Sequence, residues 1–351
     1  MPSPMPPPPT KSVFVTGANG YIGFAVCRAF VRAGWKTYGL VRRAESAHDL
    51  AAKEIIPIVG SVSPDTTFLK DLYQYTKTVD VVVSCTEQLP FGAHFEALVA
   101  IFRELAETSN RNGVGPLVLF SSGCKDYGTT GVHGSPGLAP HTEESPLRPA
   151  AFVQERTYSS LKIFEHADLF DAALIRPTPL FGYDGSYTGF AFELGAAATK
   201  AEDGTLRIPH DFNTIIHSCH VDDCAEAYLA LAEYPDRKAV AGQCFNISGH
   251  SYDTLGSIAQ ALSTEYNLHG GVVPGPSSEE TASFVDLLFG YSQWVDSTKI
   301  RQLTGWTDKR LGFAENLHVY RMAYEAAAKQ GHDGVLRIKE RIENILTPTG
   351  K

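Results

Sequence analysis

The 351-residue chain lacks a long apolar run, a surplus of positive charge and a concentrated set of cysteines. No apolar run reaches the roughly 18 residues that a membrane-spanning helix needs. A formal charge of −9 argues against nucleic acid or an anionic membrane surface as a partner. The first residues, MPSPMPPPPTK, lack the apolar stretch of a secretory signal, so residues 1–11 are expected to be a disordered, proline-rich tail.

The six cysteines are dispersed, which is typical of reduced thiols and predicts a cytoplasmic protein. One segment, NTIIHSCHVDDC, gathers side chains that can bind metals: His217, Cys219, His220 and Cys224. We expect no metal there, because a strand ending at Val221 would point Cys219 and His220 to opposite faces. The two aspartates that follow would instead cap the first turn of a helix.

Short apolar runs alternate with helical patterns through the first half of the chain. Strands are expected at 12–17, 36–42, 55–61, 80–86, 116–123 and 172–178, and helices at 22–34, 65–77, 91–113 and about 152–168. Nearly continuous apolar strands that alternate with helices predict a parallel sheet covered on both faces. Further helices are expected near 222–233, 253–265, 296–304 and 311–345.

The expected fold class is therefore α/β, a Rossmann-type doubly wound parallel sheet with a smaller, discontinuous C-terminal substrate lobe. Residues 12–180 and 215–249 would form the dinucleotide-binding domain. Residues 181–214 and 250–351 would form the substrate lobe.

Three glycines lie where the first strand turns into the first helix, spaced Gly17-x-x-Gly20-x-x-Gly23. Gly17 permits the tight turn, Gly20 lets a pyrophosphate approach the backbone, and Gly23 lets the helix pack close to the strand. The diphosphate would lie on N–H groups at the positive end of the helix. The expected contacts of the dinucleotide here are Thr16, Gly17, Asn19, Gly20, Tyr21, Ile22 and Gly23.

The end of the second strand indicates which dinucleotide is preferred. A site for NAD usually has an acidic residue there, which bonds the ribose 2′-hydroxyl. This chain has Arg42 and Arg43 instead, and no carboxylate before Glu45. Guanidinium groups suit a 2′-phosphate, so the sequence predicts NADP(H) in preference to NAD(H).

The segment TGANGYIG resembles the TGxxGxxG signature of the short-chain dehydrogenase/reductase superfamily, in its extended epimerase/dehydratase branch. Other segments follow in the order of that branch: FSSGCKDYG (120–128), LIRPTPLFG (174–182), HVDDCAEAYLALAE (220–233), GQCFNISG (242–249) and DSTKIRQLTGW (296–306). The resemblance covers about residues 12–310 and is specific for the fold but not for a substrate. It implies that Ser61 and Val62 lie near the adenine, that Cys85 and Thr86 follow the fourth strand, and that Pro177 to Leu180 line the nicotinamide.

The superfamily's reaction uses a tyrosine as proton donor or acceptor and a lysine four residues later. Tyr158 and Lys162 have this spacing, but Lys162 lies only 14 residues before Arg176, where the family usually has about 18 or more. A shifted register places Phe152 at the tyrosine position and Arg156 at the lysine position, 20 residues before Arg176. The sequence most resembles an atypical subset in which an arginine often replaces the lysine.

The two registers exclude each other, because six residues rotate a helix by a net angle of about 240°. The shifted register leaves about 22 Å of helix before Asp171, whereas the Tyr158 register leaves about 13 Å. A strand of five residues is about 16 Å long, so the Tyr158 register leaves little chain for the turn into the next strand. We therefore favour Arg156 as a cofactor-binding and catalytic residue, with Tyr158 and Lys162 as the alternative.

Other candidate catalytic groups follow the fifth strand. The family often has a serine or threonine where this chain has Gly123, so Ser122 is the remaining candidate for binding a substrate carbonyl. Tyr127 is a candidate replacement for the missing acid. His133 and His141 lie in a long loop that could cover the pocket, where histidines can also be merely solvated.

Two functions remain open from the sequence. The first is an NADP(H)-dependent oxidoreductase or epimerase that acts on a small, weakly polar organic substrate, as a monomer or homodimer. The substrate would bind between the carboxyl edge of the sheet and the late lobe. The second is a member of the fold that performs no net redox chemistry, either a dinucleotide-binding regulator or redox sensor, or an isomerase or cyclase. Loss of the tyrosine favours this second function, and the glycine turn is compatible with both.

Overall fold

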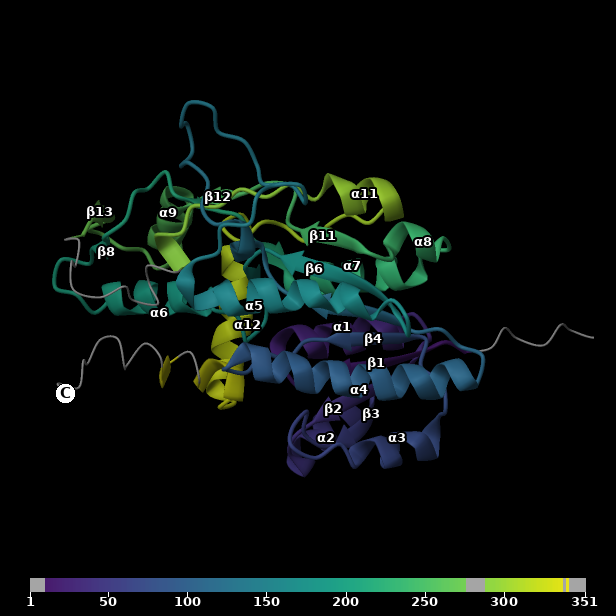
Figure 1. Ribbon diagram of the computed structural model, residues 1–351. Helices are drawn as coiled ribbons and strands as arrows, with labels where there is room; N and C mark the ends of the chain where they lie inside the picture. Colours follow the sequence, from purple (N-terminus) through teal and green to yellow (C-terminus); the bar gives the residue numbers. More distant parts are fainter. Residues whose placement is uncertain (1–9, 276–287, 337–338, 341–351) are drawn as a thin grey trace, which may run out of the picture. The chain divides into compact units, whose positions relative to one another are not determined.

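The computed structural model of the protein describes residues 10–275, 288–336 and 339–340. Its main element is a seven-stranded sheet with the strand order β11-β6-β5-β4-β1-β2-β3 (Figure 1). The strands from β3 to β6 in that order pair in parallel. The sheet strands are β1 (Ser12–Thr16), β2 (Lys36–Val41), β3 (Ile56–Val59), β4 (Val81–Ser84), β5 (Leu117–Ser121), β6 (Asp171–Pro177) and β11 (Gln243–Ile247).

Helices connect these strands, as right-handed crossovers between parallel strands require. The expected Rossmann-type sheet is thereby confirmed. The α-helices are α1 (Tyr21–Arg32), α2 (Ala47–Ala51), α3 (Phe68–Tyr75), α4 (Phe91–Arg111), α5 (Ala151–Leu161), α6 (Gly189–Ala198), α7 (Val221–Glu233), α8 (Arg237–Val240), α9 (Leu255–Glu265), α11 (Thr298–Thr304) and α12 (Leu317–Lys329).

The described part of the chain also contains short elements. The 3-10 helices are η1 (Ala44–Ser46), η2 (Cys124–Tyr127) and η3 (Lys162–His166). The strands outside the main sheet are β7 (Leu180–Phe181), β8 (Leu206–Ile208), β9 (Ile215–Ile216), β10 (Cys219–His220), β12 (Asp253–Thr254) and β13 (Val272–Pro274). They form the pairs β7–β10, β9–β12 and β8–β13.

The chain divides into two compact units. Unit 1 comprises residues 1–122, 154–175 and 228–244, and unit 2 comprises residues 123–153, 176–227 and 245–351. Each unit has its own hydrophobic core. Residues 123–153, 176–180, 215–227 and 245–249, which the sequence places in the dinucleotide-binding domain, are grouped with unit 2.

In unit 1, the core lies between the sheet and helices such as α4, which runs along β1 and β4 (Figure 1). All five residues of β1 are buried, as its apolar, partly β-branched sequence SVFVT predicts for a central parallel strand. Phe120 of β5 makes edge-to-face contacts with Phe95 and Phe102 of α4. These contacts fix the helix on the sheet through ring packing.

Helix α1 shows why the expected boundaries were close to the observed ones. Its buried residues, Gly23, Ala25, Val26, Cys27, Ala29 and Phe30, form one stripe of the helix. The helix ends before Gly34, which has a φ of +83° and donates its N–H to the carbonyl of Val31. A glycine in this conformation is a common helix terminus, as the sequence predicts.

Three expected helices are shorter than their sequence patterns. Helix α3 begins at Phe68 rather than at residue 65, because the Asp65 carboxylate accepts the N–H of Thr67 and forms a turn there. Helix α5 ends at Leu161 and continues as the 3-10 helix η3. Helix α12 covers only Leu317–Lys329 of the expected span 311–345, of which residues 337–338 and 341–345 lie outside the described ones.

In unit 2, the carboxylate expected to cap helix α7 has a different function. The Asp222 N–H donates to His220 Nδ1 at 3.1 Å, so a histidine meets the first turn. Asp223 is fully buried, and its carboxylate accepts the backbone N–H groups of Lys309 and Arg310, each at 3.1 Å. Asp223 therefore attaches the segment after α11 to the start of α7.

The loop between η2 and α5 is hydrogen-bonded to residues 292–294 of unit 2. Thr130 donates its N–H to the carbonyl of Ser292, and His141 donates its N–H to that of Trp294. The buried side-chain amide of Gln293 donates to the carbonyls of Cys124 and Gly128, both at 2.7 Å.

His217 is a buried neutral histidine in unit 2. Its side chain is 3% exposed. Nδ1 accepts the N–H of Val295 at 3.1 Å, which leaves Nε2 as the donor to the carbonyl of Gly249 at 2.9 Å. Burial lowers the pKa of His217 to about 4. Protonation would place a second N–H against the N–H of Val295.

This arrangement predicts a loss of stability in acid. The unfolded chain binds a proton at His217 near pH 6.5, while the folded protein resists it down to a pKa of about 4. Falling pH therefore favours the unfolded state within this window, by up to about 3 kcal/mol. His217→Gln keeps one donor and one acceptor but cannot titrate.

We expect urea unfolding of this variant to show a flatter pH dependence between pH 6.5 and 4 than the parent protein. The control, His133→Gln, changes an exposed histidine and should keep the parental slope. Equal slopes in all three proteins would contradict the assignment.

Candidate dinucleotide-binding site

The glycine turn of unit 1 has no room for side chains at two of its three glycines. Gly17 has a φ of +68°, and a Cβ added to it would lie 2.7 Å from the carbonyl oxygen of Cys85. A Cβ at Gly23 would lie 2.2 Å from the carbonyl oxygen of Gly17. The start of α1 is therefore packed directly against the end of β1, as expected for a dinucleotide turn.

Gly20 differs from the other two glycines because its Cβ position is tight rather than blocked. A Cβ there would meet only the Gly17 carbonyl oxygen, at 3.0 Å. Gly20 is the N-cap of α1, where no side chain caps the helix and no acidic residue occupies the first turn. The cradle thus combines an open backbone with the positive end of a 12-residue helix, which fits a diphosphate.

The strand ends around the turn carry several of the expected cofactor residues. Thr16 Oγ1 accepts the N–H of Cys85 at 3.3 Å, which joins the ends of β1 and β4. The Thr86 hydroxyl lies 3.0 Å from Nε2 of buried His94. Asn19 donates its amide to the Ser46 hydroxyl at 3.2 Å and so ties the turn to η1. Tyr21 and Ile22 are half-buried in the first turn of α1.

The expected adenine-side residues differ in their exposure. Arg42 and Arg43 directly follow β2 and are both exposed. Ser61 is half-buried and donates its hydroxyl to the carbonyl of Ser63 at 2.8 Å. Val62 is 8% exposed and packs in the core of unit 1, so little of its side chain is accessible.

Helix α5 is oriented by a residue that sequence reasoning missed. The carboxylate of Glu155 accepts the N–H groups of Phe91 and Gly92, at 2.8 and 3.0 Å, and so caps helix α4. The next residue, Arg156, is 14% exposed and pairs with Glu87 in the loop after β4, with 3.5 Å between Nη1 and Oε2. The only mark of Glu155 in the sequence is that it directly precedes Arg156.

The residues of the alternative register lie on the exposed side of α5. Tyr158 is 48% exposed, and Lys162, the first residue of η3, is also exposed. Phe152, which belongs to the part of α5 in unit 2, is 49% exposed. Within unit 1, Arg156 is thus directed to the loop after β4, whereas Tyr158 and Lys162 are directed to solvent.

Two serines end strand β5. The Ser121 hydroxyl lies 2.8 Å from the Tyr228 hydroxyl and 3.7 Å from the Cys85 thiol. Burial raises the pKa of Cys85 to about 12, so the thiol is neutral. Ser122 is half-buried and donates its backbone N–H to the carbonyl of Ile175. Tyr228, on α7, has no local sequence signal that would place it here.

The family model for the NAD-dependent epimerase/dehydratase family matches residues 13–248, about two thirds of the chain. The chain belongs to this family. The resemblance to the extended branch of the short-chain dehydrogenase/reductase superfamily is thereby confirmed.

A curated relative is UDP-glucose 4-epimerase 2 of Oryza sativa subsp. japonica, with 28% identity over 149 residues. The match covers 40% of this chain and 36% of that protein, so the chain spans only about a third of that relative.

Two solved structures show the shared fold. The dTDP-glucose 4,6-dehydratase of Bacillus anthracis, in complex with NAD, has a TM-score of 0.70 at 14% identity and covers 94% of this chain and 100% of that one. The UDP-glucose 4-epimerase of Thermotoga maritima, with UDP-glucose, has a TM-score of 0.68 at 17% identity and covers 90% and 99%.

Tyr127, expected as a possible acid, lies in the interior of unit 2 of this family member. It is 1% exposed, and burial raises its pKa. Its hydroxyl accepts from Arg176 Nη1 at 3.0 Å and donates to Asn246 Oδ1 at 2.8 Å. Arg176 also forms a buried ion pair with Asp126 at 3.1 Å. Tyr127 is therefore an anchor of this ion pair rather than a group presented to a substrate.

The remaining expected residues are buried or held in place. Pro177 ends β6, and Leu180 is 9% exposed in β7. His141 stacks on the Tyr127 ring with 5.4 Å between centroids. His133 Nδ1 lies 2.9 Å from the Tyr252 hydroxyl. The loop that carries both histidines is hydrogen-bonded to the backbone of Ser292 and Trp294.

Two expectations about metals and membranes can be compared with the described residues. Within residues 10–275, 288–336 and 339–340, no group of three or more His, Cys, Asp or Glu side chains is arranged to hold a metal ion. In the same ranges, no helix is long and apolar enough to cross a membrane.

The glycine turn predicts that two glycine substitutions have different effects. Gly20→Val should abolish dinucleotide binding while the protein stays folded, because the new side chain blocks the approach of a pyrophosphate and its Cβ meets one protein atom only, the Gly17 carbonyl oxygen at 3.0 Å. Gly23→Ala should instead destabilise the fold by about 1–3 kcal/mol, because its Cβ overlaps the Gly17 carbonyl. Thermal unfolding and fluorescence titration with NADPH measure the two effects. Parental affinity in Gly20→Val would mean that the turn has only a structural role.

Proposed function

We propose that the protein is an NADP(H)-dependent oxidoreductase or epimerase that acts on a small, weakly polar organic molecule. The observation that carries this proposal is the glycine turn, where an open N-cap at Gly20 adjoins the closely packed Gly17 and Gly23. Family membership and the NAD named in a solved neighbour support a nicotinamide dinucleotide. A cytoplasmic location and a monomeric or homodimeric state are part of the proposal.

The preference for NADP(H) rests on the two arginines after β2. Both are exposed beside a strand end that carries no carboxylate, and the Asn19–Ser46 bond holds their loop against the glycine turn. A guanidinium group can bind a 2′-phosphate with charge-assisted hydrogen bonds, which are stronger than neutral ones. The phosphate of NADP(H) would therefore be favoured over the bare hydroxyl of NAD(H).

Calorimetric titration with NADPH and NADH tests this preference. We expect NADPH to bind about ten- to hundredfold more tightly, and the double variant Arg42→Ala, Arg43→Ala to lose most of the difference. Arg111→Ala, at the far end of α4 in the same unit, is the control and should preserve it. Equal affinities for the two cofactors in the parent protein would refute the preference.

Arg156 is the proposed catalytic-site cation. Its burial beside the β4 loop supports a position from which the guanidinium bonds the cofactor ribose, in place of the family lysine. A bound nicotinamide supplies or accepts a hydride. Ser122, at the end of β5, would donate a hydrogen bond to the substrate oxygen.

The arrangement of α5 predicts which variants lose function. Arg156→Ala should weaken cofactor binding about five- to hundredfold, and Arg156→Lys should restore part of it. Tyr158→Phe and Lys162→Ala should leave binding and turnover unchanged, because both side chains are exposed on the other side of the helix. Cofactor titration and single-turnover assays measure these effects. A 10²–10⁴-fold loss of turnover in Tyr158→Phe, with normal folding, would establish the Tyr158/Lys162 dyad instead.

A second function is favoured by the same helix. The shifted register has no hydroxyl at Phe152, and the buried hydroxyl of Tyr127 is hydrogen-bonded on both sides. A dinucleotide-binding regulator, redox sensor, isomerase or cyclase needs no such acid. Cofactor binding through Arg156 without any hydride transfer would support this function over the first.

The weakly polar substrate is proposed because the late segments have few cations to meet a diphosphate. Residues 250–295 contain no lysine or arginine. Residues 181–214 contain only Lys200 and Arg207, and Arg207 pairs with Asp203. The aromatic residues of this segment differ in exposure: Phe190 and Phe192 are buried in the core, whereas Tyr183 and Tyr187 are exposed. Residues 276–287 of this segment lie outside the described ones.

A further inference from the structure

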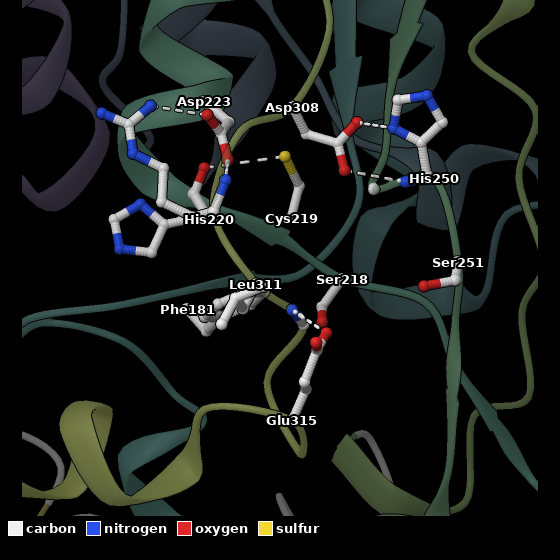
Figure 2. Close-up of a pocket in the computed structure, with 13 residues that line it drawn as sticks. Phe181, Ser218, Cys219, His220, Asp223, His250, Ser251, Asp308, Leu311 and Glu315 are labelled. Atoms are coloured by element: carbon white, nitrogen blue, oxygen red, sulfur yellow. Dashed lines mark hydrogen bonds and ion pairs between the residues drawn. The ribbon is translucent and has the colours of Figure 1, made fainter.

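Unit 2 contains a cavity of about 190 Å³ that the proposed function does not use. Its walls come from the β10 segment, the loop after β11 and the loop between α11 and α12 (Figure 2). The volume corresponds to about six water molecules or one small organic ring. The residues that matter for its chemistry are Phe181, Ser218, Ser251, Asp308, Leu311 and Glu315.

One polar group in the wall has its bonding capacity open to the cavity. Ser218 is only 7% exposed, and none of the residues that the structure describes hydrogen-bonds its hydroxyl. Its backbone carbonyl is separately bonded by the N–H of Gly249. Figure 2 labels Ser218 and Glu315 among the residues that line the cavity. The Ser218 hydroxyl therefore keeps its donor and acceptor capacity for water or a ligand in the cavity.

The charges in the wall are largely compensated. Asp308 accepts from Arg301 Nη1 at 2.7 Å and from the backbone N–H and the ring of His250. Asp223 is paired with Arg310. Glu315 lies at the exposed rim and accepts only a long bond, 3.4 Å, from the N–H of Gly312.

This charge pattern selects among ligand classes. An anion would face the Glu315 carboxylate and two further carboxylates, Asp223 and Asp308, whose arginine partners are already engaged. A free cation would find only Glu315 without an ion pair among the described residues. A neutral molecule with several hydroxyls can instead bond to Ser218, Ser251 and Glu315 at once. Phe181 and Leu311 also line the cavity and offer apolar surface for its C–H groups (Figure 2).

We propose that this cavity is a binding site for a small neutral polyol, such as a monosaccharide or a cyclitol. The Ser218 hydroxyl and the Glu315 carboxylate bond its hydroxyl groups, and Phe181 and Leu311 contact its carbon skeleton. The proposal does not depend on the function proposed above, because every wall residue belongs to unit 2 and none is among the residues expected to bind the dinucleotide.

Saturation-transfer NMR on the full chain tests the proposal, with glucose and myo-inositol as probes and with choline and sulfate as charged comparisons. We expect dissociation constants on the order of millimolar for at least one polyol, and no saturable binding of choline or sulfate. Ser218→Ala should weaken polyol binding at least fivefold. Ser263→Ala removes an equally buried serine hydroxyl of the same unit, 7% exposed, and should leave it unchanged.

A cavity-filling variant keeps the test independent of the serine. A Cβ at Gly312 would meet only Glu315, at 3.9 Å, so Gly312→Leu can extend into the cavity without a backbone clash. It should abolish polyol binding. Gly115→Leu, at a similarly open position in unit 1, should not. Three results would each overturn the proposal. The first is that the parent protein binds no polyol up to about 50 mM, the second is that Gly312→Leu binds polyol as tightly as the parent, and the third is that choline binds more tightly than any polyol.

Discussion

The carbonyl oxygen of Gly17 leaves no room for a side chain at position 23, because a Cβ there would lie only 2.2 Å from this oxygen. This contact brings the start of α1 against the end of β1. The N-cap at Gly20 follows directly after the end of β1, which pairs with β2 and β4. The proposed dinucleotide site therefore depends on the absence of two methyl groups, at Gly17 and Gly23, more than on any polar side chain.

A second constraint is the contact of Glu155 with the start of α4, which sets the directions of the side chains on α5. The carboxylate of Glu155 accepts two N–H groups at the start of α4. Because consecutive helix residues are separated by about 100°, fixing Glu155 also fixes the directions of Arg156 and Tyr158. One cap thus accounts both for the burial of Arg156 beside Glu87 and for the exposure of Tyr158.

The sheet and most helices could be predicted from the sequence because their signals are local. Continuous apolar runs mark the strands, Gly34 marks the end of α1, and the glycine spacing marks the turn. Errors arose where side chains bond at long range. Asp223 looked like a helix cap, but it binds backbone N–H groups more than 80 residues away. Tyr127 looked like a group near the sheet edge, but Arg176 and Asn246 bury it.

The side-chain amide of Gln293 forms two hydrogen bonds, to the carbonyls of Cys124 and Gly128, which lie 169 and 165 residues earlier in the chain. During synthesis, the segment after β5 therefore leaves the ribosome long before its partner exists. At about 5–20 residues per second, the delay is on the order of 8–34 s. Throughout that interval, the carbonyls of Cys124 and Gly128 lack the amide that later binds them. Residues 129–150 stay at least partly exposed even in the finished protein. The discontinuity of unit 2 thus makes its first segment the one that waits longest for its contacts while the chain is being made.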